Sequence, residues 1–307
     1  MSTLSSLSRT ALGARLAGPG LTLRTGAFTL QLRSAIPAVA DGLALLYADY
    51  PLLAADAWTD FQLDLVRPSG PRRWWRPQVR LVADGAALFQ PMPLAQALPM
   101  FEWGLNWCIA NQAHNYLMIH AAVLEQNGRA LILPAPPGSG KSTLCAALAH
   151  RGWRLLSDEL TLLRLDDGLV QPAPRPISLK NASIALIRDY LGSAAHARFS
   201  PAVHDTIKGT VAHLRAPDAS VLRAAEPARP AWVVFPQYEA GAVATLAPLS
   251  KAHAHLQLAA NSFNYSLLAA DGFNALAGLV SQSGCYTFRY SALDDGVATF
   301  AALAERP

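Results

Sequence analysis

The chain has 307 residues, of which 52% are hydrophobic and only 15% charged, so it holds enough apolar material for one large domain or two modest ones. Its net charge of +4 is small and scattered, which argues against a nucleic-acid-binding protein. Pro, Gly or Asp interrupts every apolar run before about 18 residues, and the N-terminus has no compact apolar region, so we expect neither a membrane span nor a signal peptide. The widely spaced Cys108, Cys145 and Cys285 indicate buried thiols in a cytoplasmic protein.

The first 115 residues predict a small α/β subdomain. Residues 1–20 are small, polar and interrupted by Gly and Pro, so we expect a loosely packed start. Alternation of apolar and polar residues predicts strands at 28–33, 61–66 and 79–82 and, after an Asp-Gly turn, at 87–90. Apolar residues at helical spacing predict helices at 36–47 and 94–111.

The segment Pro71–Pro77 reads Pro-Arg-Arg-Trp-Trp-Arg-Pro and joins two of these predicted strands. Arginines interleaved with tryptophans can stack on nucleic-acid bases or lie at a lipid interface. They can also form an ordinary exposed hairpin loop whose indoles pack back on the subdomain. We favour the ordinary loop and expect no nucleic-acid partner, because one loop without a wider basic face is a poor nucleic-acid footprint.

The most informative stretch follows an alternating strand, residues 116–125, that carries His120. Its parts are an apolar strand (130–133), a Pro/Gly loop, the tripeptide Lys141-Ser142-Thr143, a helix that we expect to end with Gly152 at its C-cap, a strand (154–157) and the acidic pair Asp158 and Glu159. This order of elements is typical of a P-loop nucleotide site.

The chemistry of a nucleoside triphosphate explains these residue types. A helix N-terminus offers free N–H groups to phosphate, and Gly138 and Gly140 let the backbone curve around it. Lys141 would reach the β- and γ-phosphate oxygens, and Ser142 would bind Mg²⁺. We therefore expect ATP and Mg²⁺ as ligands. The predicted contacts are Pro137, Gly138, Ser139, Gly140, Lys141, Ser142 and Thr143.

Two departures from the P-loop pattern leave an alternative open. Ala135 replaces the first glycine of the motif, and neither Pro136 nor Pro137 has an N–H group to offer. Phosphate donors must then begin at Gly138. The alternative is a glycine-rich turn before an ordinary helix.

A kinase also needs a metal ligand, a base for the acceptor hydroxyl and cations near the transferred phosphoryl group. Asp158 and Glu159 follow a predicted strand, where α/β sheets place their ligand crevice, so one carboxylate can hold Mg²⁺ and the other can accept the proton. Alternatively, they cap the strand and face solvent. Lys180, Lys208 and Arg215 are candidate cations, or else solvated loop charges. From its spacing alone, His120 is more readily read as a core residue.

Three segments resemble the kinase core of HPr serine kinase/phosphorylase: Ile119-His120, the P-loop, and Arg151–Glu159 with the sequence RGWRLLSDE. The resemblance implies the HPr kinase/PEP carboxykinase-like P-loop fold over residues 116–307. It also implies that Lys141 holds the phosphates, Ser142 binds Mg²⁺ and Glu159 is the general base. Asp158 is then the neighbour of the base, and a metal ligand in our prediction, and His120 matches the active-site histidine. The family also suggests a homo-oligomer.

The whole chain is similar to the HPr-kinase-related kinase A group, which accompanies bacterial exosortase and exopolysaccharide gene clusters. The runs PISLKN (176–181) and KGTVAHLR (208–215) carry this similarity. Departures from HPr kinase itself are a Glu at the base position, no acidic residue in 177–184 where the family has a Mg²⁺ ligand, and an unrelated first subdomain. HPr as a substrate therefore does not follow.

These observations predict an ATP-dependent kinase that transfers the γ-phosphoryl group to a hydroxyl of a protein serine or a small molecule. A nucleotide-binding regulator or assembly factor with little transfer activity is the alternative. An ATPase coupled to motion is the third possibility, although no arginine finger or sensor element is evident.

Overall fold

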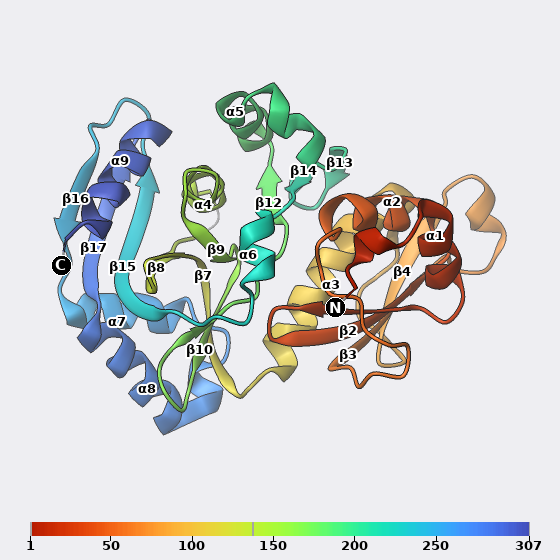
Figure 1. The fold of residues 1–307 in the computed structure, drawn as a ribbon, viewed down its shortest axis with the longest axis horizontal. Coiled ribbons are helices and arrows are strands. Elements are labelled where there is room, and N and C mark those ends of the chain that lie inside the picture. Colours follow the sequence, from red (N-terminus) through yellow and green to blue (C-terminus); the bar gives the residue numbers. More distant parts are fainter. Residues whose placement is uncertain (1, 137, 307) are drawn as a thin grey trace.

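A computed structural model describes residues 2–136 and 138–306 of the chain, and these residues form a mixed α/β structure with three sheets. The first sheet and its helices lie on one side of the molecule, and the second sheet with its helices lies on the other (Figure 1). One hydrophobic cluster contains residues from both sides of the boundary near residue 115. No helix among the described residues is both long and apolar enough to cross a membrane.

The N-terminal part is built around a six-stranded sheet with the order β1-β2-β3-β4-β5, in which β6 pairs with β4. Its strands are β1 (Leu21–Thr25), β2 (Phe28–Ser34), β3 (Phe61–Val66), β4 (Gln78–Ala83), β5 (Ala86–Ala87) and β6 (Met92–Pro93). Its helices are α1 (Arg9–Ala17), α2 (Pro37–Leu46) and α3 (Ala97–Gln112), with short 3₁₀ turns η1 (Leu4–Ser6), η2 (Pro71–Trp74) and η3 (Leu94–Gln96). The predicted hairpin is present, although its second strand is only two residues long.

The expectation of a loosely packed N-terminus is wrong. Helix α1 begins after Ser8, whose side chain accepts a hydrogen bond from the N–H of Ala11, as a helix N-cap does. Leu12 and Leu16 lie one turn apart on α1, and both are buried in the main hydrophobic cluster. The two leucines and the cap are the signals that the prediction overlooked.

The prediction that the indoles between β3 and β4 pack back on the subdomain is also wrong. Trp74 is 76% exposed and Trp75 is 67% exposed. Both residues lie at the end of η2, and their side chains point into solvent instead of packing on the subdomain.

The C-terminal part contains an eight-stranded mixed sheet with the order β11-β10-β7-β8-β15-β17-β16, in which β9 pairs with β7. Strand β8 is parallel to β15, and β15 is parallel to β17. The strands are β7 (Tyr116–Gln126), β8 (Arg129–Pro134), β9 (Arg154–Ser157), β10 (Leu160–Arg164), β11 (Val170–Gln171), β15 (Arg229–Tyr238), β16 (Thr245–Pro248) and β17 (Gly284–Tyr290). A separate antiparallel sheet contains β12 (Ile177–Lys180), β13 (Val203–Thr206) and β14 (Gly209–Leu214).

Helices cover both faces of the eight-stranded sheet (Figure 1). The helices of this part are α4 (Lys141–Ala149), α5 (Ala182–Leu191), α6 (Asp218–Leu222), α7 (Lys251–Ala260), α8 (Tyr265–Gln282) and α9 (Leu293–Ala304), with the 3₁₀ turn η4 (Ser193–Arg198). The C-cap of helix α4 is His150, two residues earlier than predicted, and Gly152, with φ +99°, belongs to the turn that follows the helix.

Strand β7 separates the two covered faces. Met118 and Ala122 belong to the hydrophobic cluster that contains Leu144 of α4, whereas Ile119 belongs to the cluster that contains α7 and α8. Side chains alternate along a strand, so His120 lies on the same face as α4. The periodicity of β7 thus places the predicted histidine on the side of the sheet that α4 covers.

Candidate functional site

The loop between β8 and α4 has the backbone conformation that its glycines allow. Gly138 has φ +87° and Gly140 has φ +84°, in the left-handed region that favours glycine. Helix α4 begins at Lys141 without a side-chain cap, so its first N–H groups point into the loop without a helical partner. Of the predicted phosphate contacts, Pro137 lies outside the described residues.

The two glycines are required for different reasons. A Cβ atom on Gly140 would lie 2.6 Å from the Tyr290 hydroxyl oxygen, whereas a Cβ atom on Gly138 would meet no atom within 4 Å. The space beside Gly138 opens away from the protein. At Gly140 both the positive φ angle and the close packing against Tyr290 therefore require glycine. At Gly138 only the positive φ angle does, because an added Cβ would have free space around it.

Gly140→Ala is expected to lower the free energy of unfolding by about 2 kcal/mol or more, because backbone strain and the clash with Tyr290 act together. Gly138→Ala is expected to cost only about 1 kcal/mol, from strain alone. Urea unfolding of both variants measures the difference. Tyr290→Phe in the Gly140→Ala background should recover part of the loss, and equal stability of the two glycine variants would contradict the packing role of Gly140.

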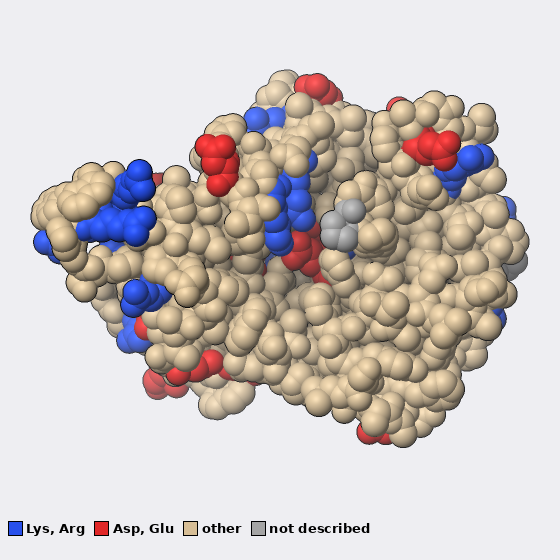
Figure 2. Space-filling view, turned by 180° about the vertical axis from the view of Figure 1, so that it is seen from behind, with Lys and Arg blue, Asp and Glu red and all other residues tan. Residues whose placement is uncertain are grey.

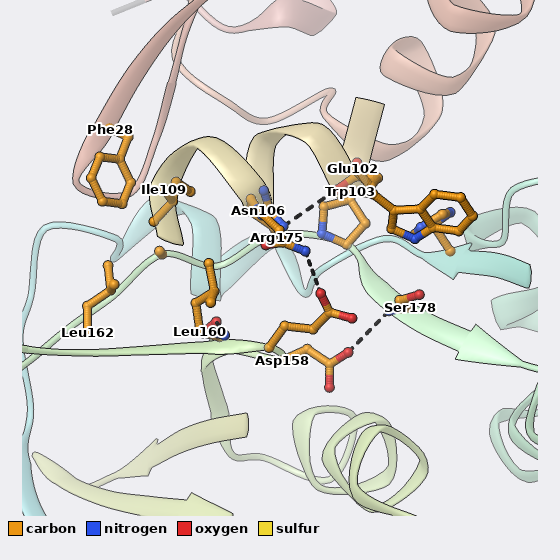
Figure 3. Close-up of a pocket in the computed structure, with 15 residues that line it drawn as sticks. Phe28, Glu102, Trp103, Asn106, Ile109, Asp158, Leu160, Leu162, Arg175 and Ser178 are labelled. Atoms are coloured by element: carbon orange, nitrogen blue, oxygen red, sulfur yellow. Dashed lines mark hydrogen bonds and ion pairs between the residues drawn. The ribbon is translucent and has the colours of Figure 1, made fainter. Parts of the chain in front are cut away.

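A lysine and an aspartate lie buried beneath this loop. Lys141 is 7% exposed and Asp158 is 5% exposed. Burial lowers the pKa of Lys141, and burial raises the pKa of Asp158 while the Lys141 ammonium opposes that shift. One Asp158 oxygen, Oδ2, accepts a hydrogen bond from the N–H of Ser178 at 3.2 Å (Figure 3).

Three buried polar atoms around the loop have no hydrogen-bond partner among the described residues: Ser139 Oγ, Lys141 Nζ and Asp158 Oδ1. Buried polar groups in proteins are nearly always satisfied. A phosphate group can accept from the hydroxyl and the ammonium, and a hydrated Mg²⁺ can bind the free carboxylate oxygen. The donor set therefore fits a phosphate and a divalent cation.

The acidic pair lies in a break between β9 and β10. Both strands pair antiparallel with β7, and the β9 ladder has a register shift next to the break. The predicted strand at 154–157, followed directly by Asp158 and Glu159, is confirmed, and after the pair the chain continues along β7 as β10. The break removes both residues from the ladder, as a bulge does, and leaves their carboxylates free for other partners.

Glu159 is held by residues that the sequence did not single out. The Asn106 side-chain amide, on α3, donates a hydrogen bond to Glu159 Oε2, and Arg175 donates to Asn106 Oδ1. Arg175 Nη2 also lies 3.9 Å from Glu102 Oε2, and the Tyr47 hydroxyl donates to Glu102 at 2.7 Å. Figure 3 shows Glu102 and Asn106 on α3 meeting Arg175 above Asp158. A chain of hydrogen bonds and one ion pair thus runs from Tyr47, at the C-terminal end of α2, to the predicted base.

Positive charge surrounds the same carboxylate. Burial acts to raise the pKa of Glu159, but Lys208, Lys180 and Lys141 together outweigh it and lower that pKa. These are three of the four lysines in the chain, and all three line one cleft. Lys208 Nζ lies 5.1 Å from the ring centre of Trp103. Two of the three predicted cations, Lys180 and Lys208, are therefore in the cleft.

The third predicted cation is elsewhere. Arg215 forms an ion pair with Asp49 of the N-terminal part and lies 3.5 Å from Asp218 of the C-terminal part. Its ion pairs therefore connect the two parts of the molecule. Arg175 instead supplies an arginine close to the acidic pair. The fourth lysine, Lys251, donates to the carbonyl of Val280 near the end of α8.

His120 lines the same cleft as Lys141 and Glu159. Burial, followed by the nearby Lys141 charge, lowers the pKa of His120 to about 4, while Glu159 acts in the opposite direction. Its ring centre lies 5.7 Å from that of Phe263. At neutral pH this imidazole is uncharged and can accept or donate a hydrogen bond.

The cleft has a volume of about 1460 Å³ and is open to solvent. Figure 2 shows basic and acidic side chains meeting where this face is hollowed. The predicted site residues that line it are His120, Gly138, Ser139, Gly140, Lys141, Ser142, Thr143 and Glu159. Asp158 lines a small cavity of about 20 Å³, to which Glu159 also contributes. The structure therefore gathers these residues in one region, which Arg215 does not line.

Aromatic residues that the sequence did not single out line the two ends of the cleft. Tyr238 and Tyr290 lie next to the loop, with ring centres 6.0 Å apart, and the Tyr290 hydroxyl lies 3.3 Å from the carbonyl oxygen of Gly140. Trp103 and Trp107 of α3 line the end near Glu159. No local motif marked these residues, because they come from strands and helices distant in sequence.

No protein-family model matches this chain, and no curated protein matches it. The geometry of the site therefore carries the functional argument. Among the described residues, no group of three or more His, Cys, Asp or Glu side chains is arranged to hold a metal ion. A Mg²⁺ ion bound through one carboxylate, one hydroxyl and phosphate oxygens would not require such a group.

Acid is expected to destabilise the protein between about pH 6.5 and pH 4. His213 is 1% exposed, and burial lowers its pKa from 6.5 to about 4. The unfolded chain takes up this proton at a higher pH than the folded chain, so the free energy of unfolding falls as the pH is lowered, by at most about 3 kcal/mol for this residue. Urea unfolding at both ends of the interval should show a smaller loss in His213→Leu. An unchanged loss would contradict the assignment.

Proposed function

We propose that this protein is an ATP-dependent kinase of the HPr-kinase type, which transfers the γ-phosphoryl group of Mg·ATP to a hydroxyl group. The observation that carries the proposal is the buried Lys141 and Asp158, each with an unpartnered polar atom, beneath an uncapped helix N-terminus and next to Glu159. Three buried free cysteines suit a reducing compartment, so we place the protein in the cytoplasm.

In this proposal the P-loop binds the phosphates. The N–H groups of Gly138 and of Gly140 to Thr143 donate to phosphate oxygens, and Lys141 neutralises the β- and γ-phosphates. Ser142 and Asp158 would hold Mg²⁺, which would supply neutralising charge to the phosphates. Lys180 and Lys208 lie in the same cleft and stabilise negative charge that develops on the transferred group.

Glu159 acts as the general base. Its carboxylate accepts the proton of the acceptor hydroxyl while that oxygen forms a bond to the γ-phosphorus, and the bond to the β–γ bridging oxygen breaks as ADP leaves. The low pKa of free Glu159 keeps it ionised at neutral pH. Phosphate binding neutralises the surrounding lysines and so moves this pKa upward, toward the range in which a base is effective. Neutral His120 is available to hydrogen bond to the phosphoryl group or the acceptor.

One observation favours the alternative of a nucleotide-binding regulator with little transfer activity. Three lysines and the Asn106 amide all stabilise the ionised form of Glu159, which makes it a weak base. If Glu159 stays this weak a base when nucleotide is bound, the protein binds Mg·ATP without turnover. An ATPase, in contrast, would release phosphate with no acceptor present.

Thermal unfolding with ADP or ATP, with and without Mg²⁺, tests the nucleotide site. A ligand that binds only the folded state stabilises it, by about 2.7 kcal/mol at about 100 times its Kd. We expect the wild type to be stabilised and Lys141→Ala not to be. Arg24→Gln, which removes the charge of the one exposed residue of β1, is the matched control and should respond like the wild type. No stabilisation of the wild type by either nucleotide would overturn the proposal.

Transfer of radiolabel from ATP to an acceptor in a cell extract then separates the kinase from the regulator and the ATPase. Label on an acceptor supports the kinase. Binding without turnover supports the regulator, and phosphate release without an acceptor supports the ATPase.

A further inference from the structure

Residues 67–80, which comprise the connection between β3 and β4 and the first three residues of β4, concentrate basic and aromatic side chains on the surface, and we name this segment the Arg-Trp loop. Trp74 and Trp75 are among the most exposed large hydrophobic residues of the described chain, at 76% and 67%. Every arginine of the loop is exposed, and none forms an ion pair with another described residue. These arginines are Arg67, Arg72, Arg73, Arg76 and Arg80.

The loop is built to project. Its base is anchored by β4, where Val79 and Leu81 are fully buried. The turn η2 (Pro71–Trp74) follows Gly70, whose φ of +115° only glycine adopts readily. The Arg73 guanidinium lies 4.7 Å from the ring centre of Trp74, so charge and indole share one surface. Figure 2 shows basic side chains gathered at the end of the N-terminal part, away from the cleft.

Two neighbouring exposed indoles on a basic loop need a partner that is both apolar and anionic. Tryptophan is enriched at membrane interfaces, where its ring is buried at headgroup level and its N–H stays hydrated. Arginine binds phosphate through paired N–H groups. We propose that the Arg-Trp loop binds the surface of an anionic phospholipid membrane, with Trp74 and Trp75 inserted among the headgroups and the arginines on lipid phosphates.

The shape of the loop favours a membrane over a nucleic acid. Single-stranded nucleic acids lie along positively charged grooves with successive stacking platforms. The indoles here are adjacent residues on a projecting loop, and neither the large cleft nor the small cavity is lined by the loop. A protruding tip with two indoles and no neighbouring acid in residues 65–83 complements a flat, negatively charged surface.

Flotation of the full-length protein with vesicles tests the proposal. The vesicles contain phosphatidylcholine alone or phosphatidylcholine with phosphatidylglycerol. We expect binding to the anionic vesicles, weaker binding to the neutral ones, and release by salt. Trp75→Ala should weaken binding on the order of tenfold, through lost apolar burial, and Arg76→Gln should weaken it roughly fivefold.

Each variant has a matched control in the same part of the chain. Trp58→Ala removes an indole that is 77% exposed and lies outside the loop, and Arg24→Gln removes an exposed charge from β1. Both controls should bind like the wild type. Thermal unfolding of all four variants should match the wild type, because every substituted side chain is exposed.

Three outcomes would overturn the proposal. The first is no binding of the wild type to anionic vesicles. The second is equal weakening by the loop variants and their controls, which would indicate a general charge effect. The third is loop-dependent binding to a single-stranded oligonucleotide, or loop-dependent self-association in light scattering, in the absence of loop-dependent vesicle binding. Because the assay needs no nucleotide, its result is independent of the kinase proposal.

Discussion

Glu159→Gln is expected to lower the rate of phosphoryl transfer by about 10³-fold, within the range that general bases contribute. The amide keeps nearly the same shape but cannot accept the hydroxyl proton. Nucleotide binding should stay close to that of the wild type, because Lys141 and the α4 N-terminus are unchanged. Removing the negative charge of Glu159 from among three lysines should strengthen the binding of the phosphates.

The measurement is the initial rate of label transfer, paired with thermal stabilisation by Mg·ATP. Glu226→Gln is the matched control, since it makes the same chemical change at an exposed ion pair with Arg223. It should transfer at the wild-type rate. If Glu159→Gln keeps more than about a tenth of the wild-type rate, Glu159 is not the general base, because so small a loss lies below the contribution of a positioned base.

Asn106→Leu is expected to reduce kcat by about 10- to 100-fold, the range seen when a residue that orients an active-site ligand is removed. Leucine fills a similar volume but cannot donate to Glu159 or accept from Arg175. The amide donor favours the ionised carboxylate, so its loss raises the pKa of Glu159. Because the base must be ionised, the acidic limb of the pH–rate profile should move to higher pH.

The pH profile separates this positioning role from a general packing role. Asn106→Asp should move the acidic limb further in the same direction, since a second carboxylate next to Glu159 disfavours its ionised form. Asn106→Gln keeps both hydrogen-bonding groups and should recover part of the rate. A lower rate with an unmoved pH profile in both Asn106→Leu and Asn106→Asp would contradict the positioning role.

Local chemistry made several parts of the site predictable. The run from Gly138 to Thr143 predicts a loop and helix start because left-handed glycines and unpaired N–H groups are properties of adjacent residues. The alternation in β7 likewise reports which residues of that strand face each side of the sheet. For the N-terminal helix, the Ser8 cap and the two leucines one turn apart are better signals than the polar composition of residues 1–20.

Contacts between distant segments could not be predicted in this way. Asn106 and Glu159 are 53 residues apart, and no periodicity or motif joins α3 to the break after β9. Arg215 shows the same limit, because its charge was visible in the sequence but its partner Asp49 was not. The exposure of Trp74 and Trp75 also depends on which surfaces the rest of the fold leaves uncovered.

The sequence by itself determined the order of the phosphate-binding elements and the identity of the residues that can carry the chemistry, since these depend on neighbours along the chain. Only the tertiary structure decided which cations and amides surround Glu159. The tertiary structure also brings two further residues to Glu159: Arg175 from the β11–β12 connection, and Asn106 from helix α3 of the N-terminal part. The physical reason is that ion pairing and burial act through space, and the chain brings those partners together only when the two sheets pack around one shared hydrophobic cluster.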